Sequence, residues 1–329
     1  MQTHGVAFTG SGSARVRAGL SNDDLAQLVE TSDEWISTRT GIRNRHVAGS
    51  GESLCSLATE AAQAALTAAS LDPDDVDLIL LATSTPDDLF GTACQVQAGL
   101  GATRAVAFDL TAACSGFVFG VVTAAQYIRT GVFKNIVVIG ADVLTRWVDW
   151  EDRTTCVLFG DGAGAVVMQA AEQDQLLGFK LHSDGGMNNC LNLAYQPSHQ
   201  ALVNDVTTQR GTFSPITMNG REVYRFAVSR VPEVLEKTLF HAELETRDID
   251  WLILHQANQR ILDAVAKRLK LPNERVVSNM AKHGNTSAAS IPLALDEWVR
   301  AGHIKAGDTV ATSGFGAGLT WGAAIFKWG

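Results

Sequence analysis

The chain has 329 residues, of which 46% are hydrophobic and 19% are charged, and its formal net charge is −9 at pH 7. This composition excludes a disordered chain, and the acidic balance argues against a general nucleic-acid binder. The apolar runs are shorter than the roughly 18–20 residues that cross a bilayer. Because the N-terminus carries no export signal, we expect a cytoplasmic protein with no membrane partner.

Strand and helix patterns alternate along the chain, which is typical of α/β architecture. Short apolar runs predict strands over residues 78–82, 105–110, 135–140, 156–159, 251–254, 308–312 and 320–326. Longer stretches predict helices over residues 54–69, 114–129, 224–239, 258–269 and 287–300.

The second half of the chain resembles the first. Residues 75–81 are similar to residues 248–254, which lie 173 positions later. Residues 127–131 are similar to residues 298–302, at an offset of 171. Two matches in the same order favour a duplicated unit. We therefore expect two α/β halves, residues 1–172 and 173–329, that share an interface.

Cys114 lies in the small-residue segment Thr111-Ala-Ala-Cys-Ser-Gly-Phe117, at the entry to an apolar helix. A thiol in the first helical turn is near the positive end of the helix dipole, which favours the thiolate and makes Cys114 the candidate nucleophile. The remaining cysteines have no CxxC spacing or disulfide pattern and are interpreted as packing residues: Cys55, Cys94, Cys156 and Cys190.

A histidine and an asparagine are candidate partners of this thiol. His255 directly follows the strand over residues 251–254, and the carboxyl end of a buried strand is where α/β folds place catalytic groups. At an offset of 171, Asn285 falls opposite Cys114. A role as a helix cap explains Asn285 equally well, and the neighbouring His283 competes for the catalytic position. The residues alone leave these alternatives open.

Two glycine clusters and one basic helix are the remaining candidates for functional sites. Residues 160–165 fit a relaxed dinucleotide-binding pattern, but a strand follows instead of the required helix, so we expect no dinucleotide site. Residues 313–318 predict either an oxyanion hole or a tight turn. Basic side chains on the helix over 258–269 and just after it indicate a solvated face or a docking surface for an anionic partner: Arg260, Lys267, Arg268 and Lys270.

Six motifs in this order resemble those of β-ketoacyl-acyl-carrier-protein synthase III, a family of thiolase-fold condensing enzymes. The resemblance covers essentially the whole chain. It rests on residues 31–43, 113–117, 159–164, 255–260, 283–290 and 314–322. The family implies an α/β thiolase-like fold in which two duplicated halves form five αβαβα layers.

The resemblance also implies a Cys-His-Asn site of Cys114, His255 and Asn285, which decides against His283. In the implied reaction Cys114 takes the acetyl group of acetyl-CoA, while the backbone N–H groups of Cys114 and Ala317 hold the oxyanion. His255 and Asn285 then stabilise the enolate formed when malonyl-acyl-carrier protein loses CO2. The enolate attacks acetyl-Cys114 to give acetoacetyl-acyl-carrier protein. No cofactor is implied, since the CoA thioester is a substrate.

The resemblance also implies residues that bind CoA, residues that dock the carrier protein and a residue of the acyl pocket. CoA-binding residues are implied at Trp35, Arg39, Arg153 and Asn258. Docking of the acidic carrier protein is implied at Arg225, Arg260, Lys267 and Arg268. The family implies a homodimer in which a loop residue of the partner subunit closes the acyl pocket, and Leu89 is the best match.

Other functions compete with acetyl-CoA-primed condensation at the start of fatty acid synthesis. A synthase of the same fold in secondary metabolism uses a branched, longer or aromatic primer. A non-catalytic carrier-binding subunit typically lacks the nucleophile, so Cys114 argues against it. A thioester hydrolase would release a free acid without forming a carbon–carbon bond.

Overall fold

Two mixed sheets form the framework of residues 4–329, the part of the chain that the computed structural model describes. The first sheet has the order β1-β7-β6-β4-β5, with strands β1 Gly5–Ser13, β4 Leu78–Ala82, β5 Val106–Leu110, β6 Asn135–Asp142 and β7 Gly162–Ala171. The second has the order β13-β14-β15-β8, with strands β8 Leu176–Ser183, β13 Trp251–Leu254, β14 Thr309–Gly316 and β15 Thr320–Lys327.

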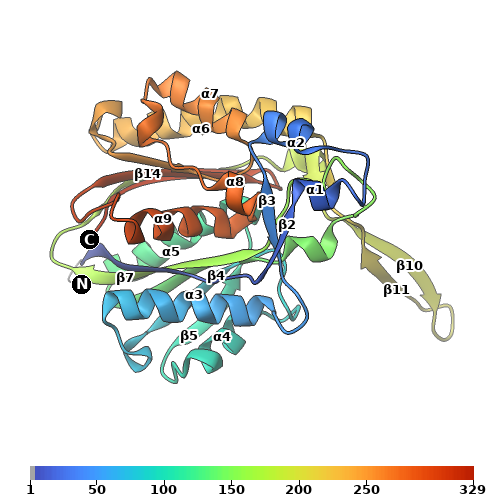
Figure 1. The fold of residues 1–329 in the computed structure, drawn as a ribbon. Helices are drawn as coiled ribbons and strands as arrows, with labels where there is room; N and C mark the ends of the chain where they lie inside the picture. The colour runs from blue at the N-terminus through green and yellow to red at the C-terminus, as the bar shows by residue number, and fades with distance from the viewer. Residues whose placement is uncertain (1–3) are drawn as a thin grey trace.

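Helices fill the three remaining layers (Figure 1). The central layer lies between the sheets and contains α5 Gly116–Arg129 and α9 Ser290–Arg300. The outer layer on the first sheet contains α3 Leu54–Ala69 and α4 Ala93–Leu100. The outer layer on the second sheet contains α6 Gly220–His241 and α7 Gln259–Leu269. These five layers confirm the predicted fold.

The two sheets have the same strand order and directions. In each, two antiparallel pairs (β1-β7 and β7-β6; β8-β15 and β15-β14) are followed by a parallel pair, β6-β4 or β14-β13. Strand β5 pairs in parallel with β4, and its counterpart beside β13 is reduced to a parallel bridge between Leu252 and Val276. Strand β7 ends at Ala171 and β8 begins at Leu176, while the division at residues 172 and 173 stays a prediction.

The central helices begin in the same way. Single 3-10 turns, η2 Ala113–Ser115 and η7 Ser287–Ala289, lead directly into α5 and α9. Their first residues, Ala113 and Ser287, have left-handed φ values of 47° and 51°. The offset here is therefore 174, and Cys114 corresponds to Ala288. Our pairing of Cys114 with Asn285 is wrong because α9 is 11 residues long and α5 is 14, so the offset of 171 holds only at the helix C-termini.

Most predicted elements are confirmed, with two differences. Residues 156–159 are not a strand: they form a turn that ends in a single bridge between Phe159 and Asn285. The run is apolar because it packs into the core beside α6 and α7, and four apolar residues do not distinguish a strand from a buried turn. Helix α6 is longer than predicted because Asn219 caps it, accepting the Glu222 N–H.

Shorter elements surround one end of the framework. They are β2 Ala18–Ser21, β3 Asn44–Val47, β9 Leu191–Asn192, β12 Thr217–Met218, α1 Asn22–Leu25, α2 Asp33–Thr40 and α8 Met280–His283. The other 3-10 turns are η1 Pro73–Asp75, η3 Leu144–Trp147, η4 Gly185–Cys190, η5 Thr246–Asp248 and η6 Asn273–Arg275. No helix among residues 4–329 has both the length and the apolarity to cross a membrane.

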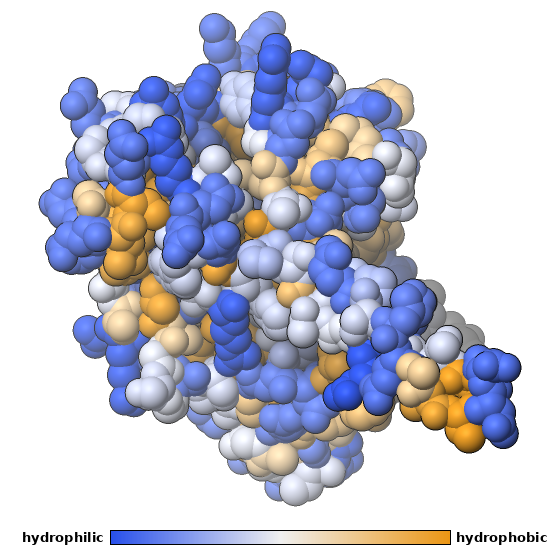
Figure 2. Space-filling view, turned by 90° about the vertical axis from the view of Figure 1, so that its right-hand side faces the viewer, coloured by the Kyte–Doolittle hydropathy of each residue, from blue (hydrophilic) through white to orange (hydrophobic). Residues whose placement is uncertain are grey.

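A hairpin of β10 Tyr195–Ala201 and β11 Thr207–Phe213 projects from the body of the molecule (Figure 1). Its tip carries exposed Leu202, Val203 and Val206. Figure 2 shows hydrophobic side chains gathered on the protrusion at the lower right. Exposed apolar side chains gathered on a projecting arm are typical of a contact surface.

Candidate active site

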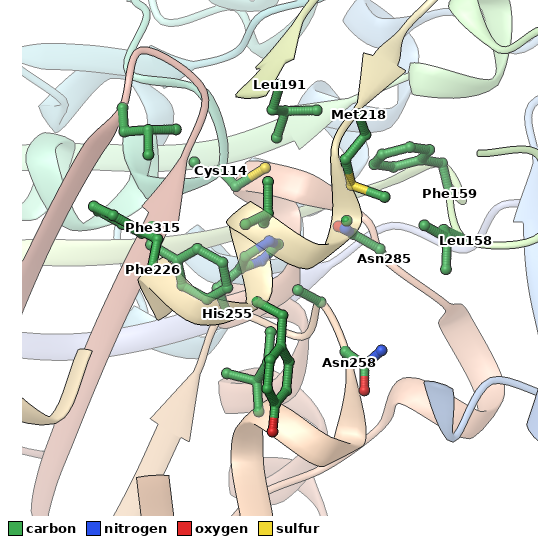
Figure 3. Close-up of a pocket in the computed structure, with 17 residues that line it drawn as sticks. Cys114, Leu158, Phe159, Leu191, Met218, Phe226, His255, Asn258, Asn285 and Phe315 are labelled. Carbon is green, nitrogen blue, oxygen red and sulfur yellow. The ribbon is translucent and has the colours of Figure 1, made fainter. Parts of the chain in front are cut away.

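Cys114, His255 and Asn285 converge on one pocket (Figure 3). Each side chain is buried, and each comes from a different element: η2, the end of β13 and the loop after α8. The pocket is narrow, about 110 Å³, and mostly apolar around these three polar groups. The structure thus brings the predicted triad together.

The last residues of β14 press against the turn that carries Cys114. A Cβ atom on Gly316 would lie 2.6 Å from the Cys114 nitrogen, and one on Gly314 would lie 2.9 Å from Ser115 Cα. Strand β14 continues to Gly316, so the turn of the 313–318 segment is confined to residues 317–319. Ala317, in this turn, and Cys114 both line one cavity.

Burial keeps Cys114 in its neutral thiol form. Burial raises the pKa of the Cys114 thiol to about 12, and the nearby Asp142 carboxylate raises it further, although a hydrogen bond from Ser287 acts in the opposite direction. Ser287 Oγ lies 3.3 Å from Cys114 Sγ. The position at a helix start is as predicted, but the expected thiolate is not, because desolvation opposes the charged form.

His255 is a neutral hydrogen-bond donor. Its Nδ1 lies 2.8 Å from Ser290 Oγ, which also accepts the Gln256 N–H at 3.3 Å. With the Ser290 hydroxyl donating to Nδ1, the ring proton lies on Nε2, and this is the tautomer that can donate into the pocket. Burial lowers the pKa of His255 to about 3, so the ring stays uncharged near neutral pH.

Asn285 is held with its amide N–H groups free for the pocket. Its Oδ1 accepts the Ser287 N–H at 3.0 Å, which leaves Nδ2 as the group able to donate. Its backbone pairs with Leu158 and Gly160, at 2.9 Å each. The competing His283 points elsewhere, with Nε2 2.8 Å from a Glu297 oxygen. The geometry thus separates the two candidates that the local sequence did not.

The glycines of the 160–165 segment serve close packing. A strand follows the glycines as the sequence predicted, although β7 already begins at Gly162, so no helix is present to bind a pyrophosphate. A Cβ atom on Gly160 would lie 2.5 Å from the His283 carbonyl oxygen, and one on Gly164 would lie 2.7 Å from the Leu293 nitrogen. These glycines let the loop before Asn285 and helix α9 approach the first sheet.

Cys114 also lines a second cavity, of about 890 Å³. Its wall is largely apolar and includes Leu144, Trp147 and Phe213. Leu89 lies at its rim with an exposed fraction of 85%. Cys114 therefore lines two cavities, a narrow one that His255 and Asn285 also line and a wide one that they do not line.

The four predicted CoA-binding residues gather near the narrow pocket. The guanidinium groups of Arg39 and Arg153 lie 4.7 and 5.3 Å from the Trp35 ring centroid. Asn258 lines the pocket and donates to the Arg39 carbonyl at 3.1 Å, which joins α7 to α2. Two cations on one indole leave an aromatic and cationic surface suited to a phosphorylated, planar ligand.

The four basic residues predicted for docking lie exposed on α6 and α7. Arg225 pairs with Glu222, and Arg268 pairs with Glu236. Arg260 lies over the Tyr224 ring, at 5.4 Å, and Tyr224 lines the narrow pocket. Ion pairs with neighbouring carboxylates reduce the net positive charge of this face.

Sequence reasoning missed several residues around the triad. Ser290 orients His255, and Phe315 packs edge-on against the His255 ring at 5.2 Å. Ser287 and the buried Asp142 lie behind Cys114. Asp142 ends strand β6, two residues beyond the predicted strand, and a carboxylate at a strand end was the one available signal.

Comparison with known proteins gives the family. The family described as 3-oxoacyl-[acyl-carrier-protein (ACP)] synthase III matches residues 108–185, and its C-terminal part matches residues 239–328. The chain is 66% identical to β-ketoacyl-[acyl-carrier-protein] synthase III of Acaryochloris marina over 98% of both chains. It is 67% identical to that of Synechococcus elongatus over 99% of this chain and 97% of the relative.

Solved structures similar to this chain indicate the same family. The 3-oxoacyl-[acyl-carrier-protein] synthase III of Aquifex aeolicus is 43% identical, with a TM-score of 0.90 over 98% of this chain and 100% of that one. The priming β-ketosynthase of the R1128 polyketide pathway has the same TM-score at 32% identity, over 99% of this chain and 97% of that one. The chain therefore belongs to the β-ketoacyl-acyl-carrier-protein synthase III family, the acyltransferase-type condensing enzymes that its motifs resemble.

Proposed function

We propose that this enzyme condenses acetyl-CoA with malonyl-acyl-carrier protein, giving acetoacetyl-acyl-carrier protein, CoA and CO2. The observation that carries this proposal is that Cys114 lines two cavities, one of which is also lined by His255 and Asn285. The synthases III of Acaryochloris marina and Synechococcus elongatus are about two thirds identical to the chain, whereas the polyketide priming enzyme is 32% identical. The identities thus favour fatty acid synthesis over the alternative in secondary metabolism.

In the first half-reaction, Cys114 attacks the acetyl thioester. The pantetheine arm of CoA enters by the narrow pocket past Asn258, with the adenine near Trp35 and Arg153, and the acetyl group points toward the wide cavity. Backbone N–H groups of Cys114 and Ala317 hold the oxyanion. The location of Ala317 and Cys114 on one cavity wall supports this role.

In the second half-reaction, malonyl-carrier replaces CoA and loses CO2. The enolate oxygen accepts hydrogen bonds from His255 Nε2 and Asn285 Nδ2, the two donors left free in the site. A neutral histidine suits this task because it donates without taking a proton from the substrate. The enolate carbon then attacks the acetyl-Cys114 carbonyl, which releases the thiolate. The thioester substrates supply the activation, so the reaction uses no cofactor.

Two features of the surroundings belong to the same proposal. The basic face formed by Arg225, Arg260, Lys267 and Arg268 receives the acidic carrier protein, because Arg260 and Tyr224 place it next to the pocket. We place the enzyme in the cytoplasm, where free thiols such as Cys114 stay reduced.

The expected result with acetyl-CoA alone is one acetyl group on each wild-type chain, detected by intact mass, and none on Cys114→Ser. An adduct only with longer or branched acyl-CoA would keep the chemistry and replace the primer. If no acyl-CoA modifies the chain, the condensing function is wrong. Released free acid without a condensation product would indicate a hydrolase.

The assembly proposed for this enzyme is a homodimer in which Leu89 of one subunit reaches the wide cavity of the other. Strand β5 is an edge strand with unusually exposed apolar side chains, Val106 at 50% and Phe108 at 37%. Leu89, which lines the wide cavity, and its neighbour Phe90 are also exposed apolar side chains. An apolar edge strand is a surface for pairing with a second copy.

We expect sedimentation to give a dimer for the wild type and Phe108→Glu to raise the dimer dissociation constant by roughly 30-fold or more, the loss typical of a central interface residue. Phe240→Glu is the matched control, since Phe240 is exposed on α6, in the outer layer on the other sheet. A monomeric wild type, or an equal effect of both substitutions, would contradict this interface.

A further inference from the structure

The wide cavity is larger than the proposed primer needs. Cys114 lines a cavity of about 890 Å³, and cavities of about 300–1,000 Å³ hold drug-sized ligands. An acetyl group fills only a small part of such a space. In the proposed dimer, Leu89 of the partner subunit takes up part of it. The contacts that fix the position of Leu89 therefore decide how long an acyl chain the cavity accepts.

Leu89 lies in the tip of a short loop, residues 88–91, which is anchored on both sides. On the first side, the Asp87 carboxylate accepts the first two N–H groups of helix α3, at 3.3 and 2.8 Å. On the other side, the Thr92 N–H donates to the Asp109 carboxylate at 2.9 Å. The two anchors are also joined, because the Thr92 hydroxyl accepts the Asp87 N–H at 2.9 Å.

Arg146 connects the first anchor to the wall of the wide cavity. Its Nη1 donates to Asp87 Oδ1 at 2.7 Å. Arg146 belongs to η3, and Leu144 and Trp147 of the same turn line the cavity. The turn is held from below by the buried Asp161 carboxylate, which accepts an N–H group and a hydroxyl of η3 at 3.0 and 2.6 Å. One turn thus lines a wide cavity and also holds the Leu89 loop.

The ion pair of Asp87 and Arg146 differs from an ordinary surface pair. Surface pairs contribute little, because two flexible side chains must be ordered together. Here the Asp87 side chain is only 17% exposed and α3 already holds it, so only Arg146, at 36% exposed, must be ordered. Burial opposes the charged carboxyl, but hydrogen bonds from the Cys55 N–H and Arg146 keep the pKa of Asp87 below its usual range. The carboxylate is therefore charged at neutral pH.

We propose that the ion pair between Asp87 and Arg146 positions Leu89 and thereby restricts the primer to a short acyl chain. This inference rests on the proposed function and on the proposed dimer. Both members of the pair are positioning residues, because they act through Leu89. Without the pair, the loop tip can withdraw from the cavity. A longer chain can then enter and bury its methylene groups against the apolar wall.

The test is a competition between equal concentrations of acetyl-CoA and hexanoyl-CoA for Cys114. The ratio of the two adducts is read by intact mass at early times. Both donors carry the same CoA, so a change in CoA binding cancels from the ratio. We expect Arg146→Gln to shift the ratio toward the hexanoyl adduct by about fivefold, the upper end for a partly exposed ion pair. The rate with acetyl-CoA alone should stay near that of the wild type.

Further variants separate this pair from a general effect on the fold. Asp87→Asn should shift the ratio in the same direction, and the double variant should shift it no further than the larger single change, because both remove one interaction. Arg146→Lys keeps the charge and should recover part of the selectivity. Arg129→Gln is the matched control: Arg129 also forms a 2.7 Å pair, with Asp174, and lies outside the residues that line the two cavities. It should keep the wild-type ratio.

Several outcomes would overturn the inference. They are an unchanged ratio in Arg146→Gln, an equal shift in Arg129→Gln, and additive shifts in the double variant. Sedimentation of Arg146→Gln should show the same dimer as the wild type, and a shift caused only by dissociation would also overturn the inference. A wild type that acylates Cys114 but prefers the hexanoyl group would do so as well. Failure of the wild type to react with any acyl-CoA would instead reject the proposed function.

Discussion

Replacing His255 by alanine should slow decarboxylation of malonyl-carrier by about 10²–10³-fold, the usual loss for one donor to a developing oxyanion. Acetylation of Cys114 should change far less, because the neutral His255 ring does not accept the thiol proton. The two half-reactions are measured separately, as CO2 release from malonyl-carrier and as the acetyl adduct by intact mass. This split follows from the pKa of about 3 and from the contact between His255 Nδ1 and Ser290 Oγ, which leaves Nε2 as the ring nitrogen available to the substrate.

Two further comparisons sharpen this prediction. Ser290→Ala keeps the ring but loses the partner of Nδ1, so decarboxylation should fall in the same direction by a smaller factor. His303→Ala, at an exposed histidine outside the pocket, should leave both half-reactions unchanged. The His255 contribution should also be constant from pH 5 to 9, since its folded pKa lies below this range. Equal loss of both half-reactions, or a step near the ordinary histidine pKa of about 6.5, would contradict a neutral donor.

The sequence predicted the central strands well because burial on both faces leaves a strong local signal. All five residues of β4 are apolar and buried, and the observed bounds match the prediction. The same signal failed at residues 156–159, which are buried in a turn. An apolar run reports burial, and the backbone conformation within that burial depends on neighbours distant in sequence.

The active site was only partly predictable for a related reason. The family motifs indicated Cys114, His255 and Asn285, while the internal repeat alone paired Cys114 with the wrong residue. A shorter α9 shifts the register by three residues between the two ends of the helix. Local patterns do not show where such a shift occurs, because the length of each helix is set by its packing against residues distant in sequence.

Ser287 and Asp142 show what the sequence could not reveal. Ser287 is 173 residues from Cys114, and its hydroxyl reaches the sulfur only through a left-handed backbone conformation. Asp142 gains its surroundings from strands β4 and β6 and from η7 together. Propensity and periodicity describe neighbours along the chain, whereas these contacts arise from the packing of two halves.

Gly316→Ala should lower the rate of Cys114 acetylation by about 10²-fold, because a new Cβ atom would lie 2.6 Å from the Cys114 nitrogen. Either the nucleophile or β14 must move, and a displacement of about 1 Å in a reacting group costs a factor of this size. The φ of Gly316 is not left-handed, so alanine is conformationally acceptable and the effect is steric. Overpacking should also destabilise the fold by about 1–3 kcal/mol. Acetylation by intact mass and thermal unfolding measure the two effects.

Two alanine variants distinguish displacement of the nucleophile from a general loss of stability. Gly19→Ala places its Cβ in open space on β2, so rate and stability should both be retained. Gly314→Ala meets Ser115 Cα at 2.9 Å and the Cys114 oxygen at 3.3 Å, so its cost in stability should be similar to that of Gly316→Ala. Its acetylation rate should fall less, because the Cys114 N–H proposed to hold the oxyanion is not obstructed. If Gly316→Ala acetylates as fast as Gly314→Ala at equal stability, the close approach of β14 serves packing, and the Cys114 amide does not hold the oxyanion.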